Sequence, residues 1–284
     1  MQIQNNLPSM NASRNQSSVT QKLKKSLEKM SSGYRIVRAG DDAAGLAISE
    51  GMRSQINGLN QAMRNINDGI GLTNVGDGAL TEVHAMLHRL KTLATEGANG
   101  TYTTEARANL DMERKELLDE IDRIGESASF SGIPLFAQEN TIPAGWVPPE
   151  KKDDITLQIG HSSSETLDVA RYYIGSRELL LDKTDFTTVD KANDSIGYIE
   201  AAVEAVSDVR ASFGSDYAHL EHTHNSLSVT SENMTAAESQ IRDTNIAEEF
   251  TDYTANNIMF QASNSMLIHA NAIPEMVMKI LNNN

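Results

Sequence analysis

An apolar residue recurs at every seventh position from Ile199 to Ile241 without a break. The column consists of Ile199, Val206, Phe213, Leu220, Leu227, Met234 and Ile241. Such a repeat is typical of one face of a long α-helix that packs against other helices. At about 1.5 Å per residue, this helix alone spans roughly 60 Å, which predicts a rod rather than a globule.

The second seam of the same helix is mixed. Its apolar members are Ile196, Val203 and Tyr217, and its polar members are Arg210, His224, Ser231 and Glu238. One strict column with a polar companion favours a helix within a bundle over an isolated two-stranded coiled coil.

The first half of the chain carries a second helical stripe. Its apolar residues step by three or four: Ile48, Met52, Ile56, Leu59, Met63, Ile66 and Ile70, continued by Leu80, Val83, Leu87 and Leu90. Six glycines between Gly51 and Gly78 oppose helix formation by about 1 kcal/mol each, so close approach of a neighbouring backbone is expected to compensate. A further helix is predicted over residues 106–124.

Four of the six prolines and the only tryptophan, Trp146, lie between Pro134 and Pro149. They interrupt the helical pattern, and the alternation in ITLQIG (155–160), followed by TLDV, predicts a small β-hairpin. The predicted fold class is mainly α, a long antiparallel helical bundle with a small β-hairpin, whose terminal helices pair on assembly.

Both ends of the chain carry apolar stripes in a background of Asn, Gln and Ser. The candidate polymerisation residues on these stripes are Ile3, Leu7, Met10, Leu23, Leu27, Met259, Met266, Ile273, Val277 and Leu281. Helices of this kind are marginal alone, because most helical stability in proteins comes from packing. We therefore expect the ends to be poorly ordered in the monomer and to become helical against partners.

Composition excludes several classes of protein. The absence of cysteine excludes disulfides, thiolate zinc sites and thiol catalysis. The net charge is -15, and it is unevenly distributed, since residues 1–60 hold eight Lys and Arg against four Asp and Glu. The rest of the chain is therefore strongly acidic, which argues against nucleic-acid binding. No apolar run approaches the roughly 20 residues of a membrane span, and the N-terminus lacks the pattern of a cleaved secretory signal.

The strongest enzyme alternative is a metal-dependent hydrolase that uses His219, His222 and His224. On a helix His219 and His222 share a face while His224 points elsewhere, and the HExxH motif is absent. The glycine run GIGLTNVGDG (69–78) follows a helical stripe and lacks the lysine of a phosphate loop. We expect no catalytic residue, metal site or cofactor.

The stretch GDDAAGLAIS (40–49) places two carboxylates before small side chains. Asp41 and Asp42 are predicted to cap a helix that begins near Ala43, since an Asp oxygen accepts a hydrogen bond from a first-turn N–H. A smooth surface for close approach of neighbouring elements is then left by Ala43, Ala44, Gly45 and Ala47.

Long stretches of the chain resemble bacterial flagellins. They include LEKMSSGYRIVRAGDDAAGLAIS and its continuation to Thr101, EIDRIGESASFSGIPLF (120–136), and ENMTAAESQIRDTNIAEEF leading to IHANAIPEMVMKIL (232–281). The resemblance implies a structural, non-enzymatic subunit that is exported unfolded without a cleaved signal and assembles outside the cell into the motility filament. The missing cysteines fit such export.

The resemblance also implies partners: copies of the chain itself, the flagellar junction and cap proteins, and an export chaperone on the C-terminal helix, but neither nucleic acid nor membrane. It divides the chain into a core helix and spoke (1–42), half of a rod domain (43–136), a short segment in place of variable outer domains (137–190), a rod helix (191–246) and a core helix (247–284). The shortness of the third segment and the missing HExxH exclude the metalloprotease variant of the family. The motif at Asp41 lies near the spoke.

The family is further recognised by an animal innate-immune receptor that reads the rod domain. The positions of this sequence that match the receptor pattern are Arg89, Leu93 and Glu113. The sequence departs from the pattern beside them, at His88 and Thr92. Without the resemblance, Arg89 is simply a surface arginine on a bundle. A hook–filament junction protein, which shares the terminal helices, is the alternative to a filament subunit.

Overall fold

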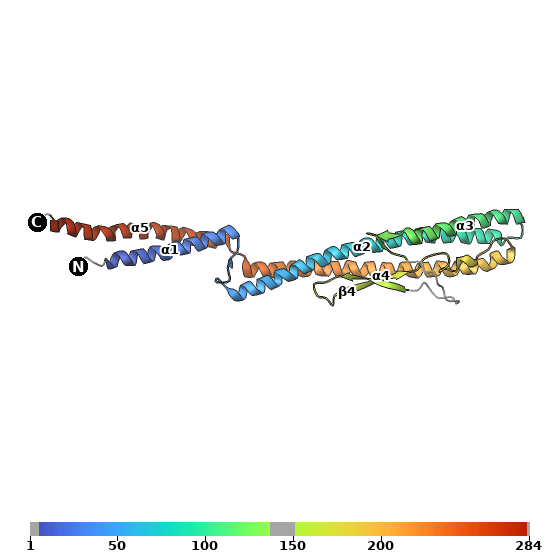
Figure 1. Cartoon of the computed structure of the whole chain (residues 1–284), viewed down its shortest axis with the longest axis horizontal. Helices are drawn as coiled ribbons and strands as arrows, with labels where there is room; N and C mark the ends of the chain where they lie inside the picture. The colour runs from blue at the N-terminus through green and yellow to red at the C-terminus, as the bar shows by residue number, and fades with distance from the viewer. Residues whose placement is uncertain (1–5, 137–150, 283–284) are drawn as a thin grey trace. The chain divides into compact units, whose positions relative to one another are not determined.

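The computed structural model describes residues 6–136 and 151–282 (Figure 1). Five long helices dominate these residues: α1 (Leu7–Ser32), α2 (Ala43–Gly97), α3 (Thr104–Ser127), α4 (Val189–Arg242) and α5 (Ile246–Asn282). A small antiparallel hairpin joins β3 (Lys151–Gln158) to β4 (Thr166–Tyr172). The mainly α fold with long helices and a small hairpin, predicted from the sequence, is confirmed.

The chain divides into two units. The terminal unit holds residues 1–56 and 232–284, and the central unit holds residues 57–231. The division falls within α2 and α4, whereas the expected segments change at residues 42/43 and 246/247. Each unit is described by itself below.

The heptad column of α4 lies in the core of the central unit. Its members there, Ile199, Val206, Phe213 and Leu220, are at most 2% exposed. The first three pack in one cluster with Leu80, Val83, Leu87 and Leu90 of α2 and with Ile121 of α3. The repeat is therefore the side of α4 that meets the other two helices.

The polar second seam of α4 is matched by polar residues of α2. In the central unit, Arg210 donates to Asp77 (2.8 Å) and the Ser231 hydroxyl donates to Asn60 (3.3 Å). In the terminal unit, Arg53 pairs with Glu238 at 2.9 Å. These partners explain why a helix with one strict apolar column tolerates polar residues beside it, since buried polar groups require partners.

Two glycines of α2 lie where a neighbouring side chain leaves no space. A Cβ on Gly69 would lie 2.6 Å from Leu157 of β3, and a Cβ on Gly76 would lie 3.2 Å from the ring of Phe213. The expectation of close approach holds here for side chains rather than for a neighbouring backbone.

A second hairpin, which the sequence analysis missed, joins β1 (Ser129–Phe130) to β2 (Ile133–Pro134). Its turn residues Ser131 and Gly132 have φ values of 51° and 82°, as a tight hairpin turn requires. Strands of two residues carry no period that could predict them. The prolines and tryptophan at positions 143, 146, 148 and 149 lie outside the described residues.

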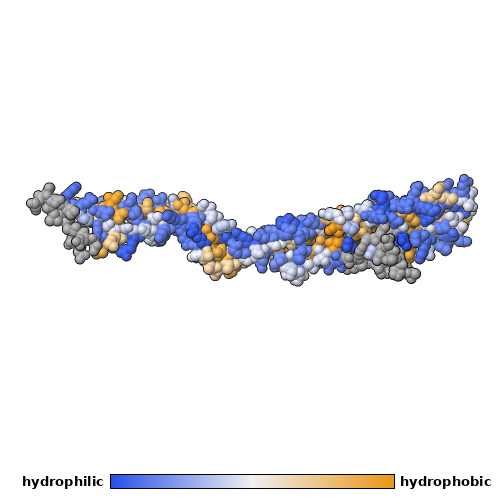
Figure 2. Space-filling model, viewed as in Figure 1, coloured by the Kyte–Doolittle hydropathy of each residue, from blue (hydrophilic) through white to orange (hydrophobic). Residues whose placement is uncertain are grey.

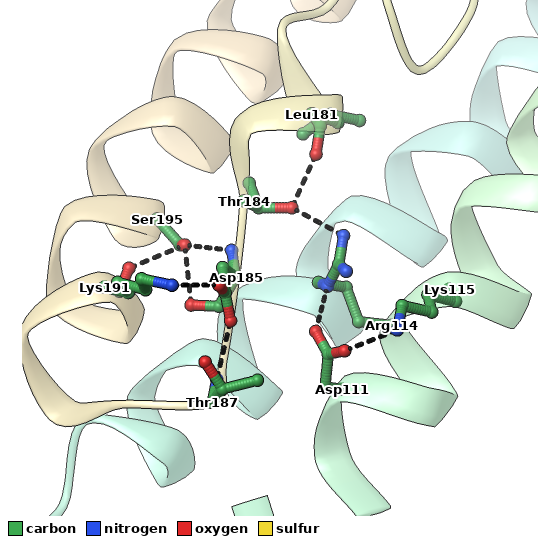
Figure 3. A network of polar contacts seen from close by, with 9 residues as sticks. All are labelled: Asp111, Arg114, Lys115, Leu181, Thr184, Asp185, Thr187, Lys191 and Ser195. Carbon is green, nitrogen blue, oxygen red and sulfur yellow. Dashed lines mark hydrogen bonds and ion pairs between the residues drawn. The ribbon is translucent and has the colours of Figure 1, made fainter. Parts of the chain in front are cut away.

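The segment that leads from β4 into α4 is fixed by polar contacts (Figure 3). Arg114 of α3 is 7% exposed, donates to Asp111 at 2.7 Å and to Thr184 at 3.3 Å, and lies over the ring of Phe186. Asp185 accepts from Lys191 at 2.7 Å. The network holds the segment between α3 and the start of α4.

In the terminal unit, α1 and α5 run antiparallel and side by side (Figure 1). Near one end of the pair Lys29 binds Glu249 at 3.0 Å. Among the described side chains of these helices few are buried: Val19, Ser26, Glu249 and Ala270. Each helix thus supplies the other with only a narrow packing strip, and the expectation that the ends order fully only against partners stays a prediction.

Candidate assembly interface

Most of the large apolar side chains that the structure describes on the α1–α5 pair lie at its surface, and Figure 2 shows apolar patches over this part of the chain. Ten of them are between 44% and 68% exposed: Leu7, Met10, Leu27, Ile246, Phe250, Ile258, Met259, Met266, Ile268 and Met276. We call this set the apolar faces of the α1–α5 pair. An exposed apolar area spread along two helices is a mark of an interaction site.

The structure places the candidate polymerisation residues as follows. Leu7, Met10, Leu27, Met259 and Met266 belong to the apolar faces, and Leu23 is half-buried. Ile3 lies outside the described residues, and so do the side chains of Ile273, Val277 and Leu281.

Sequence reasoning missed Phe250, Ile258 and Ile268, which are at least 60% exposed. Ile258 and Ile268 could have been found from two runs of three apolar residues, Ile258–Phe260 and Met266–Ile268, whereas Phe250 lies in no such run. Three consecutive residues sweep about 200° around a helix, so they cannot all face one partner. Only part of each run faces α1.

The tip of the pair is held by Asn6. Its side chain caps α1 by accepting from the Ser9 N–H (3.2 Å), and its Nδ2 donates to the carbonyl of Ala270 at 2.8 Å. Pro274 lies four residues after Ala270 within α5 and has no N–H, so that carbonyl lacks its ordinary helical partner. Asn6 thus satisfies one orphaned group on each helix.

The two predicted caps of α2 behave differently. Asp42 accepts from the Gly45 N–H at 2.9 Å and caps the helix that starts at Ala43. Asp41 instead accepts from the N–H groups of Val37 and Arg38 and pairs with Lys25 at 2.7 Å, and the Lys25 contact holds its pKa below the usual range. The expectation that both aspartates cap α2 is corrected for Asp41. Ala43 and Ala44 are exposed, whereas Gly45 is buried.

Tyr34 lies between two guanidinium groups beside this cap. Arg53 and Arg242 lie 5.4 Å and 4.8 Å from its ring centroid, and Arg242 also pairs with Glu50. Backbone bonds join the same stretches, from Arg35 N–H to the Arg242 carbonyl (2.6 Å) and from Thr244 N–H to the Gly33 carbonyl (2.9 Å). The links between α1 and α2 and between α4 and α5 are therefore tied to each other.

The three receptor candidates do not form one surface. Arg89 of α2 is exposed and donates to Glu113 of α3 at 2.7 Å, which raises the pKa of Arg89. Leu93 is fully buried in the core of the central unit. Its side chain is therefore not available to a receptor in this structure, and the exposed members are Arg89 and Glu113.

The histidines at positions 219, 222 and 224 do not gather into a ligand set. His219 and His222 are exposed and His224 is half-buried. Among the described residues, no three His, Cys, Asp or Glu side chains lie close enough together to hold a metal ion. None of the described helices is both long and apolar enough to cross a bilayer.

Comparison with protein families gives two matches. Residues 3–141 match the model of the bacterial flagellin N-terminal helical region, and residues 196–281 match that of the C-terminal helical region. Similar proteins include a flagellin of Halalkalibacterium halodurans (41% identical, 99% of this chain and 100% of that protein) and one of Bacillus subtilis (38%, 99% and 100%).

Two solved structures of flagellar proteins are also similar to this chain. The crystal structure of Bacillus cereus flagellin has a TM-score of 0.50 and 31% identity over 62% of this chain and 94% of that chain. A putative flagellar hook-associated protein from Vibrio parahaemolyticus has a TM-score of 0.59 at 14% identity, over 72% of this chain and 100% of that chain, a likeness of fold alone.

Proposed function

The chain belongs to the bacterial flagellin family, whose members are filament subunits and not enzymes, and we propose that its copies polymerise through the apolar faces of the α1–α5 pair. The ten exposed residues of these faces support the proposal. Complete burial of one large apolar side chain is worth about 1.5–3 kcal/mol. Even at half that value, ten of them balance an association cost of about 4–15 kcal/mol.

Charge favours contact between copies as well. Helix α1 carries five Lys and Arg against one Glu, whereas α5 carries four Asp and Glu against one Lys. A basic helix next to an acidic helix of a neighbouring copy is attracted to it, and this attraction weakens as salt is added. Assembly by this route orients the subunits and excludes like-charged pairings.

Export and the remaining partners are part of the same proposal. Before assembly the apolar faces need protection, which an export chaperone on α5 would supply, and the same faces would meet the junction and cap proteins at the ends of a filament outside the cell. Exposed Ala44 at the spoke offers a second contact with little side-chain bulk. We expect Ala44→Leu to hinder assembly more than folding.

Receptor recognition rests on fewer residues than the sequence pattern implied. Arg89 and Glu113 form an exposed pair on the central unit, and a receptor acidic group would have to compete with Glu113 for the arginine. We propose that Arg89→Ala weakens receptor binding, whereas Leu93→Ala acts through the stability of the core.

Seeded polymerisation tests the main proposal, with filament fragments of the same protein as seeds. Met266→Asp should melt like the natural chain yet fail to extend the seeds, because a charge cannot be buried in a subunit contact without a partner. Met112→Asp is the matched control, since Met112 is an equally exposed methionine on α3, with 57% against 68% exposure. Extension by Met266→Asp at the natural rate would refute the proposed faces.

The same assay addresses the junction-protein alternative. A filament subunit extends seeds continuously, whereas a junction protein adds a fixed number of copies and stops. Removing residues 1–30 or 250–284 should abolish extension and leave the central bundle folded. Growth that stops after one layer of subunits would favour the junction protein.

A further inference from the structure

Two histidines of α2 that the assembly proposal does not use face each other on the central unit. His84 and His88 are four residues apart, so both rings project from the same side of the helix. Their Nε2 atoms lie 2.9 Å apart, and the rings meet edge to face with centroids 4.5 Å apart. We propose that this pair binds a divalent transition-metal ion as a two-point chelate, with Cu²⁺ favoured over Zn²⁺.

The chemistry of the two ligands indicates the metal. In the metal-free chain the 2.9 Å separation is a hydrogen bond between the two ring nitrogens, and a metal ion bound to both would take the place of the shared proton. Imidazole nitrogen suits Cu²⁺, Ni²⁺ and Zn²⁺, and the affinity of a given nitrogen site is highest for Cu²⁺ in this series. Cu²⁺ should therefore bind more tightly than Zn²⁺.

The pair is open to an ion from one side. A ring nitrogen binds a metal only with its lone pair free, so metal binding releases the proton that the two Nε2 atoms share. His84 is half-buried while His88 is exposed, so an ion reaches the pair from the solvent side.

Three features limit the affinity. Within the described residues no third His, Cys, Asp or Glu completes the set, so water fills the other coordination positions. Arg210 adds positive charge near His84, although Asp77 pairs with it at 2.8 Å. The buried Nδ1 of His84 has no hydrogen-bond partner among the described residues, so this ligand lacks the supporting acceptor of tight sites. The site is a two-point chelate that exchanges metal with the solvent.

The test is titration of the full-length monomer with CuCl₂ in a buffer that does not bind metal. Binding is measured by calorimetry and by paramagnetic broadening of the histidine ring signals. The signals of His84 and His88 should broaden first. His88→Gln should weaken Cu²⁺ binding at least as much as loss of a supporting group does, about tenfold or more.

His222→Gln is the matched control, because His222 is an exposed helical histidine in the set at positions 219, 222 and 224. It should leave the first binding event unchanged. Thermal melts establish that both variants fold, which their exposed positions favour. Equal losses in the two variants, or first broadening at any of the other five histidines, would overturn the proposal. The monomer needs no polymerisation for this assay, so the outcome is independent of the assembly proposal.

Discussion

At the scale of single residues, Asn6 shows how one side chain joins two helices. It caps α1 and also satisfies the Ala270 carbonyl that Pro274 leaves without a partner. Asn6→Ala should destabilise the α1–α5 pair by about 1 kcal/mol or more, since loss of an N-cap alone costs that much. Thermal unfolding and amide exchange near Ser9 would measure the loss.

A double-mutant cycle isolates the second role of Asn6. In Pro274→Ala the new N–H bonds the Ala270 carbonyl, so Asn6→Ala should cost less in that background. Asn15→Ala, at an exposed position of α1, is the control and should change stability little. Equal costs of Asn6→Ala in both backgrounds would mean that the bond to Ala270 contributes nothing.

Two glycines of α2 should respond in opposite ways to the same substitution. A Cβ on Gly45 would lie 2.5 Å from the capping carboxylate of Asp42 and 2.7 Å from Ile36, whereas Gly51 has open space. Gly45→Ala should destabilise by about 1 kcal/mol through the cap. Gly51→Ala should stabilise by up to about 1 kcal/mol, because alanine favours a helix. Denaturant unfolding measures the stability of both variants. If both are more stable than the natural chain, the Asp42 carboxylate can move away from the added methyl group without loss.

At the scale of elements, the Arg114 network positions the segment that enters α4. Asp111 and Arg114 are 6% and 7% exposed, so Asp111→Ala leaves a buried guanidinium without its charge partner. That loss should cost about 3–5 kcal/mol. Lys115 is a control on the same carboxylate, since its side chain is 64% exposed. Lys115→Ala should cost under about 1 kcal/mol. The free energies of unfolding of the two variants measure both costs, and similar costs would contradict the role of the buried pair.

Asp185 in the same segment gives a pH dependence. Hydrogen bonds from Lys191 and Thr187 hold its pKa far below the ordinary 3.8. The unfolded chain therefore binds this proton first as pH falls, so the stability due to Asp185 is present above pH 3.8 and is lost below it. The stability difference between the natural chain and Asp185→Asn should shrink as pH is lowered from 5 to 2. A constant difference would refute the assignment.

At the scale of the whole molecule, the two units differ in how much they bury. The central unit has a continuous core from three helices, whereas the described residues of the α1–α5 pair bury little beyond Val19, Ser26, Glu249 and Ala270. The terminal unit should open at a lower free energy, because opening exposes little apolar surface. Amide exchange in the monomer should be faster in residues 7–30 than in α2 and α4 of the central unit. Equal protection would refute this and the sequence-based expectation of weakly ordered ends.

Several features followed from the sequence alone. The seven-residue column of α4 and the three-and-four stripe of α2 are local periods, and a local period defines which residues share a face. The long helices and the β3–β4 hairpin could therefore be predicted, whereas the family was predicted from the long stretches that resemble flagellins. The short β1–β2 hairpin could not, because two residues hold no period.

Only the tertiary structure decided which face meets which partner. It buries Leu93 rather than exposing it, turns Asp41 to the loop while Asp42 caps α2, and leaves Phe250 and Ile258 outward while α1 covers another side of α5. It also brings His84 and His88 within 2.9 Å. The physical reason is that burial and pairing depend on residues far apart in the chain and on side-chain orientation, which no period along the sequence encodes.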